Sequence, residues 1–218
     1  MKQISIFDLD GTLIDAYSLI HISLNFTRRK LGYNELDYHL VKKSVGGGDI
    51  GLIKKFFKEE DRDNALKTYR ETQKQYINKE NVKLQKGAKE ILLLLKEKKI
   101  KITIATNRNK FAANLVLEKL NITNYFDLVF TADDVKEKKP SPEIIEKIYE
   151  KFNCSKEECF YVGDMDIDLK TGLNAGVDTY IVLTGSSTLD EILKVEKEAN
   201  VFSDLIELKN FLLNNHLI

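Results

Sequence analysis

The 218-residue sequence predicts a three-layer α/β core around a parallel sheet, with a small α-helical domain inserted after the first strand. Five short apolar runs read as strands, and segments with helical periodicity separate the last four of them. Strands that alternate with helices favour a parallel sheet covered by helices on both faces. The strand runs are almost wholly apolar, which agrees with burial on both sides.

The predicted strands are, in chain order, residues 4–7, 101–106, 128–131, 159–164 and 179–184. Helical periodicity follows three of them, at residues 109–120, 142–152 and 166–175. Each such strand–helix pair is the unit from which a parallel sheet with crossover connections is built.

Residues 15–85 break this alternation, because they contain no convincing strand pattern. Helical patterning is present in IGLIKKFF (50–57) and in a long polar stretch near 61–80, and Gly46-Gly47-Gly48 interrupts it. The chain rejoins the sheet near Lys86-Gly87. We therefore divide the chain into an α/β core, residues 1–14 and 86–218, and a helical cap domain, residues 15–85.

Composition restricts the classes of function. The 34 basic residues balance the 34 acidic ones, which gives no indication of a nucleic-acid surface. The longest apolar run, ILLLL (91–95), is too short to span a membrane, and the chain begins directly with a strand pattern. Cys154 and Cys159 form neither a disulfide framework nor a zinc motif. We expect a soluble, cytoplasmic protein.

Polar residues follow three of the predicted strands directly. Asp8 and Asp10 lie past the first strand, Thr106 and Asn107 past the second, and Asp164 at the end of the fourth. Ligands of open parallel sheets bind beyond the carboxyl ends of the strands, where the strand order reverses. We therefore expect these side chains to converge on one edge of the sheet.

Four carboxylates would gather there: Asp8, Asp10, Asp164 and Asp168. Two unit charges 4 Å apart repel by roughly 4 kcal/mol at an effective dielectric constant near 20. A bound cation would remove this repulsion, and a site with only oxygen ligands selects a hard ion. Mg²⁺ suits a few carboxylates together with a substrate phosphate.

A metal alone does not account for Thr106-Asn107 or Lys139. A hydroxyl, a neighbouring backbone N–H and an ammonium in one pocket are what a phosphoryl group requires. Gly11 allows close approach of the backbone, and the loop amides of residues 9–12, Thr12 among them, could donate further hydrogen bonds. One aspartate could then attack phosphorus while a second acts as general acid and base.

The sequence resembles the haloacid dehalogenase superfamily of aspartate-nucleophile phosphatases, in the branch whose Rossmann-like core carries an inserted helical cap. Four motifs, in order along essentially the whole chain, support this resemblance: DLDGTL (8–13), the Thr-Asn of IATNRN (104–109), the Lys of KKPSPE (138–143) and GDMDID (163–168). Two further segments are similar to phosphoglycolate phosphatases, SVGGGDIGLIKKFF (44–57) and ITNYFDLVFTADDVKEKKPSPEII (122–145).

The resemblance implies a role for each matching residue. Asp8 would be the nucleophile, and Asp10 the general acid and base. The Mg²⁺ ligands would be Asp8, Asp10 through its backbone carbonyl, Asp164 and Asp168. The phosphate group would be held by Gly11, Thr12, Thr106, Asn107 and Lys139.

The implied activity is Mg²⁺-dependent hydrolysis of a phosphomonoester through an aspartyl-phosphate, on 2-phosphoglycolate or another small organic phosphate. The protein would act as a monomer or homodimer, with Gly46 to Gly48 facing the substrate. Arg108 departs from the pattern, because Lys is commoner after Thr-Asn in that group. Met165 and Asp166 also replace a frequent small residue, and all three bear on substrate identity.

Other interpretations stay open. One alternative is a phosphomutase resembling β-phosphoglucomutase, which would need a His early in the cap; His21 is near that position but shifted. A second is a phosphate-binding regulatory protein that catalyses no reaction. Asn107 could cap the helix that follows it, and Lys138 could take the place of Lys139. Asp166 and Asp168 could form the acidic first turn of a helix, which we favour for Asp166 only.

Overall fold

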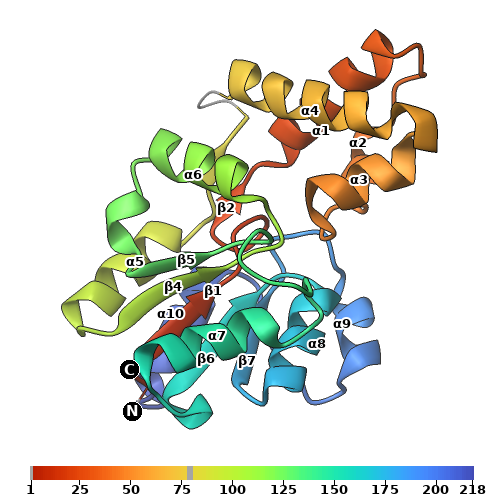
Figure 1. Cartoon of the computed structure of the whole chain (residues 1–218). Helices are drawn as coiled ribbons and strands as arrows, with labels where there is room; N and C mark the ends of the chain where they lie inside the picture. Colours follow the sequence, from red (N-terminus) through yellow and green to blue (C-terminus); the bar gives the residue numbers. More distant parts are fainter. Residues whose placement is uncertain (1, 78–80) are drawn as a thin grey trace.

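The computed structural model describes residues 2–77 and 81–218, so residues 78–80 of the predicted polar helical stretch lie outside the described residues. Its centre is a six-stranded sheet with the order β5-β4-β1-β6-β7-β8, in which all neighbouring strands are parallel (Figure 1). The strands are β1 (Ile4–Phe7), β4 (Lys101–Ala105), β5 (Leu128–Phe130), β6 (Cys159–Gly163), β7 (Asp178–Val182) and β8 (Asn200–Phe202).

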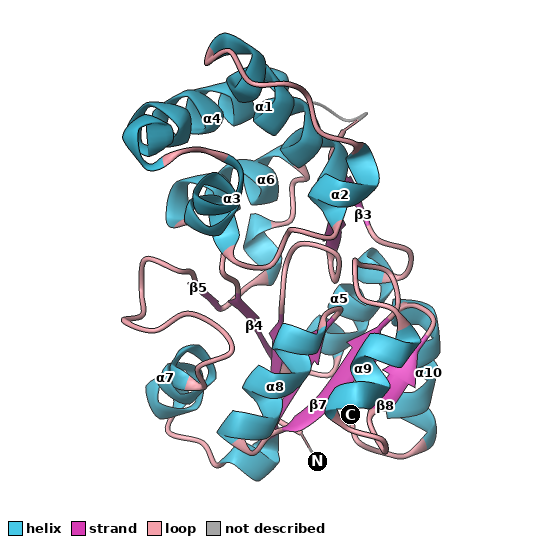
Figure 2. Cartoon of the chain, turned by 90° about the vertical axis from the view of Figure 1, so that its right-hand side faces the viewer, coloured by secondary structure: helices cyan, strands magenta, loops and turns pink. Residues whose placement is uncertain are grey.

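Helices cover both faces of the sheet (Figure 2). One layer contains α5 (Ala88–Glu97), α6 (Lys110–Lys119) and α10 (Leu205–Asn214), and the other α7 (Glu143–Phe152), α8 (Asp166–Ala175) and α9 (Leu189–Val195). In β6, Phe160 and Val162 pack on the first layer, whereas Cys159 and Tyr161 pack on the second. Side chains that alternate between two buried faces produce the continuous apolar runs of the sequence. The predicted three-layer α/β core is confirmed.

The five predicted strands are present, with ends within two residues of the prediction, but the structure adds three more. A sixth sheet strand, β8, was not predicted, and β2 (Ile14–Asp15) pairs antiparallel with β3 (Lys83–Leu84). The prediction that residues 15–85 contain no strand was therefore wrong at both ends of that segment. Strands of two or three residues are too short to show a periodic pattern.

A helical module lies between β2 and β3 and stands beyond the carboxyl ends of the sheet strands (Figure 1). Its helices are α1 (Tyr17–Lys30), α2 (Tyr38–Lys42), α3 (Gly48–Phe56) and α4 (Arg62–Tyr76). It has its own apolar cluster, which includes Ile20, Leu24, Leu52, Phe57 and Tyr69. The β2–β3 ladder lies where we divide the chain into core and cap, and that division remains a prediction. The described residues also contain three short 3₁₀ turns: η1 (Glu59–Asp61), η2 (Thr123–Tyr125) and η3 (Lys156–Glu158).

Helix caps explain where α6 and α10 begin. The Asn109 side chain accepts a hydrogen bond from the Ala112 N–H at the start of α6, and Asp204 caps α10 in the same way. The prediction that Asn107 caps α6 was therefore wrong, because the chain after β4 runs two residues further before the helix starts. Within residues 2–77 and 81–218, no helix has both the length and the apolar character that crossing a bilayer requires.

Candidate active site

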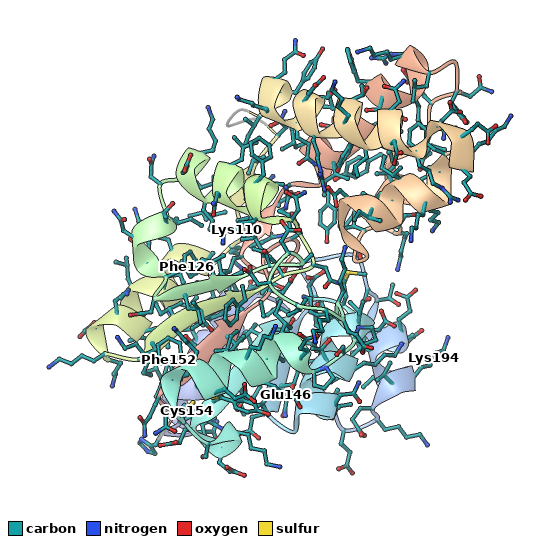
Figure 3. All side chains as sticks on the ribbon, viewed as in Figure 1. Lys110, Phe126, Glu146, Phe152, Cys154 and Lys194 are labelled. Atoms are coloured by element: carbon teal, nitrogen blue, oxygen red, sulfur yellow. The ribbon has the colours of Figure 1, made fainter. Side chains whose placement is uncertain are left out.

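The sheet order places β1 between β4 and β6, so the loops that follow these three strands meet at one edge. Together with the helical module they enclose a cavity of about 50 Å³. Its lining includes six of the predicted site residues: Asp8, Asp10, Thr106, Asn107, Lys139 and Asp168. The helical module and the loops after β1 and β4 both contribute side chains to this lining. Figure 3 shows the module above the sheet, with Lys110 at the start of α6.

Lys139 is the centre of the polar contacts. Its Nζ atom donates to Asp8 Oδ1 at 2.6 Å, to Asp168 Oδ1 at 2.7 Å and to the Tyr161 hydroxyl at 3.0 Å. Burial acts to lower the pKa of Lys139, but the carboxylates of Asp168 and Asp8 raise it above its usual value. The ammonium is therefore charged, and the structure places Lys139, not Lys138, between the two carboxylates.

Asp8 lies at the end of β1, with only 6% of its surface exposed. Burial raises the pKa of Asp8 to about 7, against the opposing effect of Lys139, and the neighbouring Asp168 raises it further. The nucleophilic role predicted for Asp8 requires an ionised carboxylate, and would therefore need more positive charge than one ammonium shared with Asp168 provides.

Asp8, Asp164 and Asp168 each present an oxygen within 4.8 Å of the others, and all three are buried. The contacts of Asp164 are neutral donors: the hydroxyl groups of Thr12 and Tyr17 and the Ser186 N–H. Burial and then the charges of Asp168 and Asp8 raise the pKa of Asp164 well above its usual range. A set of oxygen ligands with incomplete charge compensation fits a hard divalent cation such as Mg²⁺.

The carboxylate of Asp10 is not part of this cluster and faces Arg108 instead. A contribution of Asp10 to a metal site would thus have to come from its backbone carbonyl, as the resemblance implies, and this stays a prediction.

The loop after β1 is braced against Asp164. Gly11 has a φ of +90°, and a Cβ there would lie 2.4 Å from Asp164 Oδ2, so only glycine fits. The Gly11 N–H donates to the Ile14 carbonyl at 2.7 Å, and the Thr12 hydroxyl donates to Asp164 Oδ1 at 3.0 Å. Both predicted phosphate-binding groups thus have protein partners here, and their contact with phosphate remains a prediction.

Thr106 and Asn107 follow β4 directly. The Thr106 hydroxyl accepts from the Arg108 N–H at 3.1 Å, and its own proton can still be donated. Asn107 Oδ1 accepts from the Lys139 N–H at 3.0 Å, while Nδ2 donates to the Gly46 carbonyl at 2.8 Å. Asn107 therefore connects Lys139 to the helical module, and binding of phosphate by Thr106 and Asn107 stays a prediction.

Arg108 was noted in the sequence only as a departure from the pattern, with no role in the site. Its Nε donates to Asp10 Oδ2 at 2.8 Å and its Nη2 to Asp10 Oδ1 at 2.7 Å, which makes a two-pronged ion pair. Nη1 donates to Gln73 Oε1 on α4 at 3.3 Å. Burial opposes the charge on Arg108, but Asp10 raises the pKa of the guanidinium above its usual value. In the sequence, only its position directly after Thr106-Asn107 could have indicated that Arg108 belongs to the site.

A second polar set was also missed. Asp49 on α3 is 8% exposed, and its Oδ2 accepts from Arg70 Nε at 2.7 Å and from Asn109 Nδ2 at 2.7 Å. This set joins the helical module to the loop after β4. Nothing in the sequence relates Asp49 to Asn109, because the contact depends on how the module sits over the sheet.

The three-layer core, with a lysine-bridged aspartate cluster at its carboxyl edge, is the arrangement of a phosphatase of the haloacid dehalogenase-like type. The chain belongs to the haloacid dehalogenase-like hydrolase family, whose family model matches residues 5–182. It is 33% identical to a phosphoglycolate phosphatase of Aquifex aeolicus over 99% of both chains. It is also 30% identical to the pyrophosphatase PpaX of Bacillus cereus, over 92% of this chain and 93% of that one.

Solved structures agree on the fold. A predicted phosphoglycolate phosphatase from Haemophilus somnus superimposes with a TM-score of 0.87 at 19% identity, over 96% of this chain and 97% of that one. A hydrolase from Pseudomonas syringae gives a TM-score of 0.82 at 22% identity, over 98% and 99% of the two chains. The resemblance seen in the sequence is thus confirmed at the level of family and fold.

Proposed function

We propose that the protein is a Mg²⁺-dependent phosphomonoester hydrolase that forms an aspartyl-phosphate on Asp8. The observation that carries the proposal is the position of Asp8, held by Lys139 at a cavity that also contains the carboxylate of Asp10. One carboxylate would serve as nucleophile and the other as proton carrier, with the phosphoryl oxygens held between them.

In the first step Asp8 attacks phosphorus, the bond to the ester oxygen breaks, and Asp10 gives that oxygen a proton. In the second step Asp10 takes a proton from water, which attacks the aspartyl-phosphate and releases phosphate and free Asp8. Lys139 and Thr106 would hold the phosphoryl oxygens. Bound Mg²⁺, held by Asp8, Asp164 and Asp168, would supply charge stabilisation for the phosphoryl group.

The proposed substrate is 2-phosphoglycolate or another small organic phosphate. The name of the Aquifex aeolicus relative supports it. Pyrophosphate is the second candidate, because the Bacillus cereus relative is a pyrophosphatase at similar identity.

The phosphomutase alternative has less support. The His21 ring lies 3.0 Å from the Leu36 carbonyl through Nε2 and stacks edge-on against Tyr38, contacts that lie within the helical module. The regulatory alternative would not require the Lys139-bridged pair of carboxylates. We propose that the protein is cytoplasmic, in keeping with its two free thiols, Cys154 and Cys159. Cys154 lies at the end of the sheet away from the cavity (Figure 3). We further propose that the protein acts as a monomer or homodimer.

The test is phosphate release from 2-phosphoglycolate, pyrophosphate, sugar phosphates and nucleoside monophosphates, with Mg²⁺ and with EDTA. We expect Mg²⁺-dependent release that is lost in Asp8→Asn. Asp166→Asn is the matched control, because Asp166 belongs to the same sequence motif as Asp164 but pairs with Lys170 at the surface. Equal activity of wild type and Asp8→Asn, or no activity on any ester, would refute the proposal.

A further inference from the structure

Arg108 occupies both carboxylate oxygens of Asp10 at the cavity, at 2.8 Å and 2.7 Å. Asp10 is the residue that, in the proposed reaction, has to hand a proton to the ester oxygen. The two bonds hold the carboxylate against Arg108 as one partner of an ion pair, whereas a general acid has to reach the ester oxygen and carry a proton. We therefore expect this pairing to open when Asp10 acts.

Lys139, the other basic residue that lines the cavity within the described part of the chain, already lies between Asp8 and Asp168. Arg70, which is not among the lining residues, pairs with Asp49 on α3. Arg108 is 7% exposed and lines the cavity. A planar guanidinium in such a place matches a carboxylate or a phosphate through two parallel hydrogen bonds.

The groups that face Arg108 come from three elements. Asp10 approaches from the loop after β1, Gln73 from α4, and Tyr69 and Asp49 are close enough to influence its charge. Asp49 would repel an anion, but its Oδ2 accepts from both Arg70 and Asn109. Apolar side chains, among them Ile20, Leu52 and Ala112, form the rest of this wall and would keep bulk water from competing.

We propose that Arg108 is a specificity-determining residue that binds a second anionic group on the substrate, a carboxylate or a phosphate distal to the phosphoryl group. When that group enters the cavity, the guanidinium transfers to it from Asp10, which frees Asp10 for proton transfer. Phosphate esters with a second anion are thereby selected over neutral esters, both in binding and in turnover. This inference rests on the proposed hydrolase.

The test compares two esters that differ in one group. 2-Phosphoglycolate carries a carboxylate, and 2-hydroxyethyl phosphate carries a neutral hydroxymethyl group in its place. The measured quantity is the ratio of kcat/KM for the two esters. We expect Arg108→Gln to lower this ratio about a hundredfold, and Arg108→Lys about tenfold, because lysine keeps the charge but not the fork.

The matched control is Arg29→Gln, the same chemical change at an exposed position of α1 that pairs with Glu35. It should leave the ratio unchanged. An unchanged ratio in Arg108→Gln would overturn the inference. If kcat/KM falls equally for both esters, Arg108 acts only by holding Asp10 or the fold; if it falls for neither, Arg108 has no part in the reaction.

Failure of the proposed function is distinguishable from failure of this inference. If wild type releases phosphate from no ester of the panel given above, the hydrolase proposal falls, and calorimetry of these two esters with wild type and Arg108→Gln then decides. A dissociation-constant ratio that favours the carboxylate in wild type and collapses in Arg108→Gln supports the role of Arg108. A ratio that is the same in both proteins refutes it.

Discussion

Gly48 begins α3 at the point where the helical module touches the core. Its φ is +70°, and a Cβ there would lie 2.3 Å from the Asn107 carbonyl oxygen. Real Cβ contacts are essentially never shorter than 3.0 Å. In Gly48→Ala the two backbones must therefore separate by about 0.7 Å, the difference between these distances. Because both groups are backbone, α3 as a whole has to move away from the loop after β4.

The expected effects on stability and on catalysis differ in size. A positive φ costs alanine about 1 kcal/mol relative to glycine, and loss of the neighbouring Asn107–Gly46 hydrogen bond adds about 1 kcal/mol. The free energy of unfolding should thus fall by about 2 kcal/mol. A displacement approaching 1 Å at a catalytic cavity costs about a hundredfold in rate, so kcat/KM should fall by that factor.

Two other glycines separate the causes. Gly32 also has a positive φ, +78°, but a Cβ there meets nothing within 4 Å, so Gly32→Ala measures backbone strain alone. Gly47 has a φ of −84°, and a Cβ there would lie 3.4 Å from Gly51, an ordinary contact. Urea unfolding and phosphate release are measured for all three variants. If Gly48→Ala has the same kcat/KM as Gly47→Ala, catalysis does not require the contact between the start of α3 and the loop after β4.

Three further outcomes are expected. Lys139→Met should lower the free energy of unfolding in EDTA by about 3–5 kcal/mol and abolish phosphate release, because two buried carboxylates lose their ammonium. Tyr161→Phe removes the hydroxyl that contacts Lys139 and donates to Asp168, and should lower the free energy of unfolding by only about 1–2 kcal/mol while phosphate release persists. Asp164→Asn should raise the Mg²⁺ concentration for half-maximal activity at least about tenfold. It should also stabilise the metal-free protein, because it removes a buried carboxylate that lies near Asp168 and Asp8. A lower urea midpoint of unfolding in EDTA would contradict this. Burial opposes the charge of Asp127, but the Ile102 N–H, Lys101 and Lys96 lower its pKa below the usual value. The resulting stability is present above the unfolded-state pKa near 4 and is lost as pH falls through the lower folded-state pKa, so urea unfolding of Asp127→Asn should differ from wild type at pH 7 and match it near pH 2.

The sequence was sufficient to predict five of the six strands of the central sheet and several of the residues at its edge. Strands buried on both faces leave unbroken apolar runs, and the residues after β1, β4 and β6 are brought together by strand order alone. Asp8, Thr106 and Asp164 could thus be placed near one another without any knowledge of distances, whereas Lys139 was assigned through the family motif.

What could not be predicted depends on how the helical module packs on the core. Asp49 reaches Asn109, and Gln73 reaches Arg108, across sequence separations of 60 and 35 residues that no local pattern records. The short strand β8 was missed for a different reason, since its three residues, with one fully buried, carry no alternation.

The contacts between module and core suggest why such a cap can both close and open. Three consecutive residues of the loop after β4 each bond to the helical module: Asn107 to the Gly46 carbonyl, Arg108 to Gln73, and Asn109 to Asp49. Hydrogen bonds of this kind can be exchanged for bonds to water at a net cost of only about 1 kcal/mol each, whereas the apolar contact of Leu19 and Tyr76 with the core would expose its surface on separation. Arg108 also pairs with Asp10, the proposed general acid. An anion that binds Arg108 would therefore break this ion pair and change the contact between Arg108 and Gln73 of the module at the same time. Closure of the cap and release of the acid would thus depend on the same loop.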